Sequence, residues 1–200
     1  MDQTASIKHL SDEEIAIRAA AGSPGAFEAL VTRYNARLCH FLRHKTQTDQ
    51  DVEDLAQETF LKAFRNMGRF DPRRRFSTWL YTIAVRQAIS RNRRQKPQGK
   101  SSIFKSHEPD PEQALIQKER SQNLWHQAST LPSHEYEALW LRYAEDMSVK
   151  DIAKVLKKRP LTVRVLLHRA RLSLAKKMHP KSASEGLESP ASVEHKLSVL

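Results

Sequence analysis

The longest helical pattern in the chain lies between Asp49 and Met67. Residues that suit a protein interior recur there at spacings of three and four, which places them on one face of a helix. They are Val52, Leu55, Ala56, Thr59, Phe60, Ala63, Phe64 and Met67. The opposite face carries Glu53, Asp54, Gln57, Glu58, Leu61, Lys62 and Arg65. The pattern predicts a helix that starts at Thr48 or Asp49, ends near Gly68 and packs one face inward.

Two amphipathic helices are predicted ahead of this one. Ser11 and Glu14 have the spacing of a capping box, and Gly22 is typical of a helix end. Ser23, followed by Pro24, is predicted to cap the second helix. The apolar stripe of that second helix consists of Phe27, Leu30, Val31, Tyr34, Leu38, Phe41 and Leu42.

A basic loop and a further helix follow the long one. The loop, residues 69–75, places Phe70 among arginines. Ser77 or Thr78 is expected to cap the helix. Its inward face is Trp79, Leu80, Ile83, Ala84 and Ala88, and its outer stripe is Thr82, Arg86, Ser90 and Arg93. This combination favours a surface that follows a nucleic-acid strand and stacks its bases, although a solvated helix face would give the same stripe.

The helical periodicity disappears between residues 95 and 113, where the composition is typical of a linker. Four helices are predicted beyond it, the third capped by Ser148 with Asp151 and the fourth beginning at Thr162. A short capped helix, a brief turn and a helix with basic outer residues form a helix-turn-helix pattern. The last helix carries a stripe that can enter a major groove, composed of Arg164, His168 and Arg171 with Val165 and Arg169 beside it.

The net charge and its distribution along the chain indicate what kind of partner the protein binds. The formal net charge is +11, which favours nucleic acid or another anionic surface. The charges are also segregated, because the stretch from Asp49 to Glu58 has acids and no base, whereas that from Lys62 to Arg94 is strongly basic. An acidic stripe suits a basic protein partner, and the basic half suits phosphates.

Other features limit the functional classes. A single cysteine, Cys39, precludes an intrachain disulfide, and neither a membrane span nor a secretory signal is found, so we expect a cytoplasmic protein without membrane insertion. His40 and His44 stand four positions apart beside Cys39, but surface histidines are expected rather than a metal site. Without a phosphate-binding glycine loop, a metalloprotease motif or a nucleophile motif, we predict neither catalysis nor a cofactor. Acids such as Glu135 and Glu137 are expected on a solvated helix face.

Three segments resemble bacterial sigma factors of the sigma-70 family. Residues 54–64, DLAQETFLKAF, are similar to the family's core-binding helix. The segments RFDP at 69–72 and FSTWLYTIA at 76–84 look like the adjoining segment that melts and reads the promoter. Residues 148–171 are similar to the helix-turn-helix of the family's last domain. Their order and spacing match the small extracytoplasmic-function type.

The resemblance implies an all-α fold with two small helical domains joined by a flexible linker, the second a four-helix, winged-helix-like helix-turn-helix domain. It places core polymerase binding and −10 recognition in residues 1–95, a linker at 96–111, −35 recognition at 112–178 and a flexible tail at 179–200.

The resemblance also implies partners and contact residues. Contacts with the β′ coiled coil of core RNA polymerase would come from Asp54, Leu55, Gln57, Glu58 and Leu61. Reading and opening of the −10 element would come from Arg69, Phe70, Arg74, Arg75, Trp79, Thr82, Arg86, Ser90 and Arg93. Reading of the −35 element would come from Thr162, Arg164, Val165, His168, Arg169 and Arg171. The β subunit is a further expected contact, and an anti-sigma factor is an expected inhibitor.

Some positions depart from the family. A glycine or small residue is common where Lys157 stands, the family's proline lies one position before Pro160, and polar residues are frequent where Val165 and Leu166 stand. These differences change the turn and the start of the reading helix, so the −35 sequence is not predicted.

Two other functions compete with that of a sigma factor. One is a sigma-like decoy that occupies an anti-sigma factor without binding DNA; the other is a stand-alone helix-turn-helix repressor whose first domain dimerises. The acidic stripe on the long helix, interpreted as unpaired, argues against the repressor. Basic residues that a decoy would not need argue against the decoy: Arg86, Arg91, Arg93, Arg94 and Arg164.

Overall fold

The computed structural model describes residues 7, 9–23, 25–46, 48–95 and 124–178. Within these residues the chain contains helices and turns and no strand, which confirms the predicted all-α fold. The chain divides into two compact units, the first built from the helices up to residue 95 and the second mainly from those after residue 123. None of the described helices is both long and apolar enough to span a bilayer.

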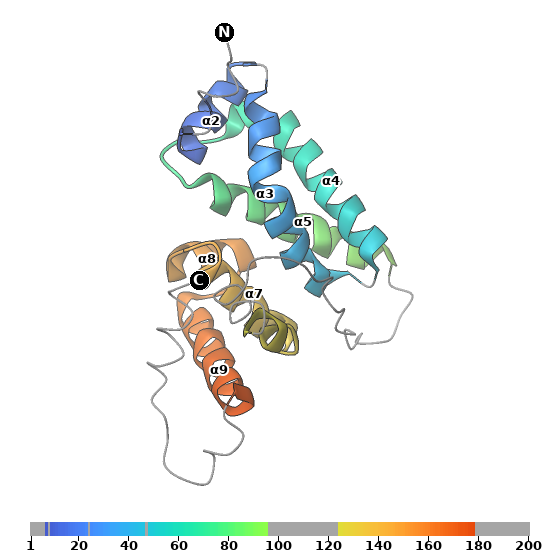
Figure 1. The fold of residues 1–200 in the computed structure, drawn as a ribbon, viewed down its shortest axis with the longest axis vertical. Coiled ribbons are helices and arrows are strands. Elements are labelled where there is room, and N and C mark those ends of the chain that lie inside the picture. Colours follow the sequence, from blue (N-terminus) through green and yellow to red (C-terminus); the bar gives the residue numbers. More distant parts are fainter. Residues whose placement is uncertain (1–6, 8, 24, 47, 96–123, 179–200) are drawn as a thin grey trace, which may run out of the picture. The chain divides into compact units, whose positions relative to one another are not determined.

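Among the described residues, α2, α3, α4 and α5 form the body of the first unit (Figure 1). α3 packs against α2 and α4, and α5 packs along α4 and also meets α2. Short 3₁₀ turns follow α3 and α4. The bounds are α2 Asp12–Ala20, α3 Ala26–Leu42, α4 Asp49–Arg65 and α5 Phe76–Gln95, with the 3₁₀ turns at Arg43–Lys45 and Met67–Arg69.

Local signals define both ends of α2 as predicted. The Ser11 hydroxyl accepts a hydrogen bond from the Glu14 backbone N–H (3.2 Å), and the Glu14 carboxylate accepts one from the Ser11 N–H (2.8 Å). At the other end Gly22 adopts φ 79°. The Gly22 N–H donates to the Ala19 carbonyl, and the Ser23 N–H donates to the Arg18 carbonyl. This is the Schellman arrangement, in which a residue with left-handed backbone closes the helix.

Three predicted helix boundaries in the first unit are wrong. α3 starts at Ala26 after Gly25, whose φ is 75° and which has no side chain to cap the helix, so Ser23 is not its cap. α4 ends at Arg65 rather than near Gly68, because the chain tightens into a 3₁₀ turn there. α5 starts at Phe76, ahead of both residues expected to cap it.

Aromatic and aliphatic side chains fill the core of the first unit. The rings of Phe41 and Tyr81 meet edge to face with centroids 5.0 Å apart, and those of Tyr34 and Phe76 do so at 5.3 Å. Most of the inward stripe predicted for α4 is buried, from Val52 to Ala63. On α5 the prediction is less accurate: Tyr81 and Val85 are buried in place of the half-exposed Trp79 and Ile83.

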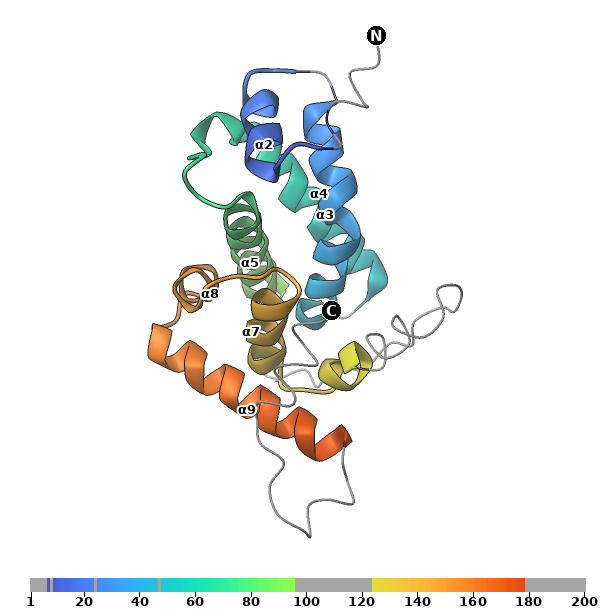
Figure 2. The same ribbon diagram turned by 60° about the vertical axis from the view of Figure 1, so that its left-hand side comes forward.

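The second unit is built from α7 (Ser133–Tyr143), α8 (Val149–Leu156) and α9 (Pro160–Met178) (Figure 2). Residues 124–129 are also helical and contribute Trp125, whose ring lies 4.8 Å from that of Trp140. Tyr136 completes this aromatic cluster, 6.1 Å from Trp140. The predicted linker at 96–111, the residues that follow it up to 123 and the predicted tail at 179–200 lie outside the described residues.

Glu137 overturns the prediction of a solvated face on α7. It is 3% exposed and accepts a hydrogen bond from the Ser133 hydroxyl (2.8 Å). His134 Nδ1 lies 3.6 Å from the same carboxylate. A buried carboxylate requires such partners, and Glu137 is therefore a core residue of the second unit.

The turn between α8 and α9 is three residues long, Lys157–Arg159, because α9 begins at Pro160 rather than at Thr162. Proline is favoured at the first position of a helix, where its missing N–H is not needed. Lys157 adopts φ 52°, and the N–H of Lys158 bonds to the Ala153 carbonyl (3.0 Å). A positive φ favours glycine, so the structure explains why a small residue suits this position.

Candidate protein and nucleic-acid interfaces

The outer face of α4 presents acids and a leucine to solvent. Glu53, Gln57 and Glu58 are exposed, and the Leu61 side chain is 48% exposed. We call these four residues the α4 ridge. Leu55, the remaining apolar candidate on this helix, is fully buried and has no surface to offer a partner.

An apolar groove of about 730 Å³ runs beside the ridge between α3 and α4. Its lining is Phe27, Val31, Asn35, Cys39, Glu53, Gln57, Phe60, Leu61 and Phe64. Phe64 was predicted to face inward but is 58% exposed, with its ring centroid 5.0 Å from that of Phe27. Periodicity alone could not find this groove, because Phe64 continues the inward stripe of α4 in the sequence, whereas its side chain is exposed beside Phe27 of α3.

Arg91 on α5 ties the acidic helix to the basic one. Its Nη2 pairs with Asp51 Oδ1 and lies 3.6 Å from Asp54 Oδ2. The Arg91 side chain is 20% exposed and that of Asp51 is 24% exposed. The acidic stripe is therefore partly paired within the protein, and Arg91 is not part of an open basic face. Glu53 and Glu58 are the acids best presented to a partner.

An aromatic cluster lies where the basic loop enters α5. The Phe70 ring lies 5.4 Å from Trp79 and 5.7 Å from Phe76, and Trp79 lies 5.8 Å from Phe76. Phe70 and Trp79 are half-exposed, whereas Phe76 is fully buried. Two accessible rings anchored on a buried one form a platform on which an unpaired base can stack.

Arginines surround this platform. Arg69, Arg74 and Arg75 are exposed. The Asp71 carboxylate accepts hydrogen bonds from the backbone N–H (3.1 Å) and Nε (3.2 Å) of Arg73, and these bonds lower the pKa of Asp71. The charged Asp71 carboxylate therefore holds the loop in shape. The arginines of the loop outnumber this one acid, so the loop keeps a net positive charge.

The predicted outer stripe of α5 is accessible to different degrees. Arg86 and Arg93 are exposed, whereas Thr82 and Ser90 are half-buried. The Thr82 hydroxyl donates to the Thr78 carbonyl (2.7 Å), a bond within the helix that leaves an oxygen lone pair for a ligand.

The first turns of α9 present most of the predicted reading residues. Thr162, Arg164, His168 and Arg169 are exposed, and the apolar Val165 side chain is 42% exposed. Arg171 differs from them: it is half-buried, with its Nε atom closed to solvent. Leu161 in the first turn is exposed as well, so the accessible surface of α9 mixes positive charge with aliphatic side chains.

Of the two histidines near Cys39, which were predicted to lie at the surface, His44 is buried and His40 is half-buried. Burial lowers the pKa of His40 to about 4, so His40 is neutral at pH 7. Burial also raises the pKa of the Cys39 thiol. Among the residues that the structure describes, no cluster of three or more potential ligands could bind a metal ion.

Two protein families match the chain, "Sigma-70 region 2" over residues 30–98 and "Sigma-70, region 4" over residues 121–174. RNA polymerase sigma-H factor of Pseudomonas aeruginosa is 30% identical over 182 residues, which cover 84% of this chain and 94% of that protein. ECF RNA polymerase sigma factor SigW of Bacillus subtilis is 29% identical over 170 residues, covering 78% and 91%. In fold the chain is similar to sigma factor RpoE of Bartonella quintana, solved in complex with the anti-sigma factor NepR (TM-score 0.58, 20% identity, 78% and 98% covered).

Proposed function

The chain belongs to the sigma-70 family as an RNA polymerase sigma factor of the extracytoplasmic-function type, and from that premise we propose which of its surfaces bind the polymerase and which bind the promoter. The observation that carries the proposal is that one small unit combines an acid-rimmed apolar groove with a basic platform of accessible aromatic rings.

The α4 ridge and the groove beside it are the proposed contact with core RNA polymerase. An exposed Leu61 and an exposed Phe64 next to Glu53 and Glu58 suit an amphipathic partner helix that presents apolar and basic residues. A coiled coil of the β′ subunit would offer such a helix. Asp54 is a weaker candidate because it already lies beside Arg91.

The platform at the start of α5 is the proposed reader of the −10 element. Phe70 and Trp79 would stack on bases that leave the duplex, which regains part of the stacking energy lost on melting, about 1–3 kcal/mol per base. Phosphates of the opened strand would be held by exposed arginines: Arg69, Arg74, Arg75, Arg86 and Arg93. Thr82 and Ser90 would supply polar contacts from the same face.

The exposed face of α9 is the proposed reader of the −35 element as duplex. Arg164 and Arg169 suit guanine edges or phosphates, and the exposed apolar Val165 suits a thymine methyl group. Thr162 and His168 lie on the same accessible side. Arg171 fits this role less well because it is half-buried, and it would act by supporting the helix.

An anti-sigma factor is a further proposed partner, and its proposed target is the same α3–α4 groove. The groove is open and apolar, which suits a regulatory helix that competes with the polymerase. A decoy without DNA binding is less well supported, because the chain presents accessible aromatic and basic side chains on α5 and α9. We place the protein in the cytoplasm, where polymerase and chromosome meet.

Reconstitution with core polymerase tests the proposal. The holoenzyme should start transcripts at defined genomic promoters, and Glu58→Gln should weaken core binding by roughly 3- to 10-fold at unchanged stability. Glu28→Gln, which removes an exposed acid of α3 outside the groove lining, is the matched control and should bind like the wild type. No association with core under conditions in which a known sigma factor associates would refute the function.

A further inference from the structure

The first turn of α5 is capped from a distant part of the chain. Arg75 precedes the helix, and its carbonyl accepts a hydrogen bond from the Trp79 N–H, so Arg75 is the N-cap residue. A guanidinium group contains no acceptor atom, so the Arg75 side chain cannot cap the helix as serine or aspartate would. The Phe76 N–H instead donates to Glu13 Oε1 at 2.8 Å, across 63 positions of sequence. A carboxylate there satisfies a backbone donor and complements the positive end of the helix dipole.

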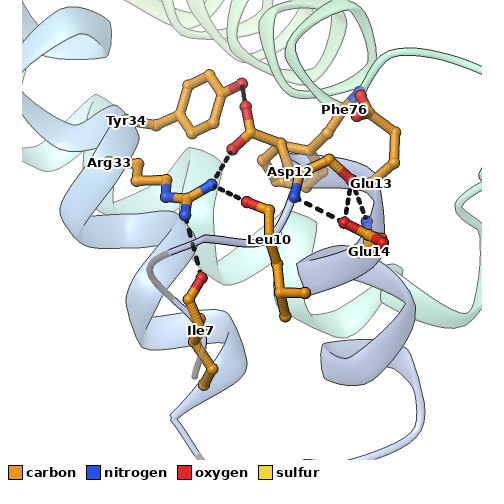
Figure 3. A network of polar contacts seen from close by, with 9 residues as sticks. Ile7, Leu10, Asp12, Glu13, Glu14, Arg33, Tyr34 and Phe76 are labelled. Atoms are coloured by element: carbon orange, nitrogen blue, oxygen red, sulfur yellow. Dashed lines mark hydrogen bonds and ion pairs between the residues drawn. The ribbon is translucent and has the colours of Figure 1, made fainter. Parts of the chain in front are cut away.

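A second set of contacts fixes α2, which carries Glu13 (Figure 3). The neighbouring Asp12 accepts from Arg33 Nη1 (2.8 Å) and from the Tyr34 hydroxyl, both on α3. The Arg33 guanidinium also donates to the carbonyl of Leu10 (2.9 Å) and to that of Ile7 (3.1 Å). Asp12 and Glu13 are thus directed to different helices, Asp12 to α3 and Glu13 to α5.

The capped residue is also the base of the aromatic platform. The fully buried Phe76 ring lies 5.3 Å from the Tyr34 ring and also contacts both half-exposed rings, Phe70 and Trp79. A displacement of the first turn of α5 would therefore move the two rings proposed to stack on bases. The α4 ridge lies on a different helix and makes none of these contacts.

We propose that α2 braces the −10-reading platform and that Glu13 is its positioning residue, a role that rests on the proposed function of that platform. The match to sigma-70 region 2 begins at residue 30, so the brace lies ahead of the matched segment. Glu13 sets where α5 starts. Because its carboxylate occupies the helix N-terminus, phosphates are left to the surrounding guanidinium groups.

Full-length Glu13→Ala, Glu13→Gln and Glu14→Gln proteins test the role. Glutamine keeps an acceptor oxygen, whereas alanine removes it. Glu14→Gln removes the charge of an adjacent acid but keeps an acceptor for the Ser11 N–H, so the capping box of α2 remains, and it serves as the matched control. The measurements are affinity for core polymerase, permanganate reactivity of unpaired thymines on a promoter used by the wild-type holoenzyme, and hydrogen exchange of the amides at 76–80 in the free protein.

Glu13→Ala should reduce promoter opening by about 3- to 10-fold and speed exchange at residues 76–80 by a similar factor, with core affinity within about twofold of the wild type. Glu13→Gln and Glu14→Gln should stay within about twofold of the wild type in all three. Equal losses of core binding and promoter opening would make Glu13 a general fold residue and overturn the proposal, as would a glutamine variant as defective as the alanine one.

These measurements distinguish a failure of the Glu13 proposal from a failure of the proposed sigma function. A wild-type protein that never forms a holoenzyme would refute the sigma function of these surfaces and, with it, the reading role of the brace. If the amide hydrogens of residues 76–80 exchange at the wild-type rate in Glu13→Ala, the positioning role of Glu13 is wrong, whether or not the holoenzyme is active.

Discussion

Lys157 occupies a backbone conformation that few side chains tolerate well. Its φ of 52° closes α8 in the Schellman arrangement, with the Lys158 N–H bonded to the Ala153 carbonyl. The left-handed conformation costs a residue with a Cβ atom about 1 kcal/mol relative to glycine. The short turn ahead of α9 is therefore formed against a local preference, and packing of the second unit stabilises it.

Replacing this residue should stabilise the second unit. Lys157→Gly removes the Cβ penalty, and we expect a gain of about 0.5–1 kcal/mol in unfolding free energy. Urea unfolding followed by tryptophan fluorescence measures it, since Trp125 and Trp140 lie in this unit. Lys154→Gly, three residues earlier inside α8, should lose a similar amount instead. A loss for both variants would show that the Lys157 side chain makes contacts worth more than its strain.

His40 should make the stability of the first unit sensitive to acid. Burial lowers its pKa to about 4 in the folded state, with Arg43 as a smaller cause, whereas an unfolded histidine titrates near 6.5. The unfolded state therefore binds more protons between these values, and stability falls as the pH drops from about 6.5 towards 4. Partial exposure limits the expected loss to about 1–2 kcal/mol between pH 7 and 5.

Comparison of the wild type with His40→Gln isolates this effect. The variant should show a smaller decrease of unfolding free energy between pH 7 and 5, whatever its stability at pH 7. Parallel pH profiles for the two proteins would assign the acid sensitivity to other groups.

Polar side chains connect α4 and α5 at two levels of the helix pair. Arg91 bridges to Asp51 and Asp54, and Lys62 Nζ donates to Gln87 Oε1 at 3.0 Å. The helix proposed to bind the polymerase is thereby joined to the helix proposed to bind DNA. These bonds favour one rotation of α4 relative to α5.

Breaking the ion pairs that Arg91 makes with Asp51 and Asp54 should destabilise the first unit. Arg91→Ala leaves two carboxylates without their partner in a half-buried site, and we expect a loss of roughly 1–3 kcal/mol. Arg43→Ala is the control, because its pair with Asp49 is 3.6 Å long and about half exposed on both sides. That change should cost less than about 0.5 kcal/mol. An equal loss of unfolding free energy in the two variants would show that the ion pairs of Arg91 stabilise the protein no more than an exposed pair does.

The helices themselves were predictable because their signals are local. The stripe from Val52 to Ala63 and the caps at Ser11, Thr48 and Ser148 depend on residues within one turn of each other. The burial of Glu137 was not predictable, since its partner Ser133 looks like any helix start.

The candidate site was predictable only in part. The exposed acids of α4 and the exposed arginines follow from the sequence pattern. The cap supplied by Glu13, the bridge from Arg91 and the groove beside Phe64 join elements that are distant in the chain, so no local pattern encodes them. Sequence reasoning recovers faces of single helices and misses the contacts between them.

The two units should behave as separate folding units in solution. Trp79 lies in the first unit and Trp125 and Trp140 in the second, so tryptophan substitutions can assign each fluorescence transition. We expect Arg91→Ala to shift only the transition reported by Trp79, and Lys157→Gly only the other. A single transition that both substitutions move would mean that the units unfold together.

The two proposed DNA surfaces should differ in their dependence on salt and sequence. Arg86→Ala should weaken promoter binding uniformly and reduce the slope of log affinity against log salt by about one unit, as for a phosphate contact. Arg164→Ala should change promoter preference by about 1–3 kcal/mol, as for a base contact. Quantitative binding to promoter variants at several salt concentrations separates the two, and identical effects would contradict the division between the surfaces.

The bond from Glu13 to Phe76 has a consequence for synthesis on the ribosome. Its two ends are 63 positions apart, so closing that loop is entropically unfavourable until intervening helices have docked. A nascent chain that has emerged only as far as α4 already contains the ridge proposed for the polymerase but not the helix that Glu13 caps. Because α4 packs against α5, which also supplies Phe76 and Tyr81 to the core, neither proposed surface of the first unit is complete until α5 has left the ribosome.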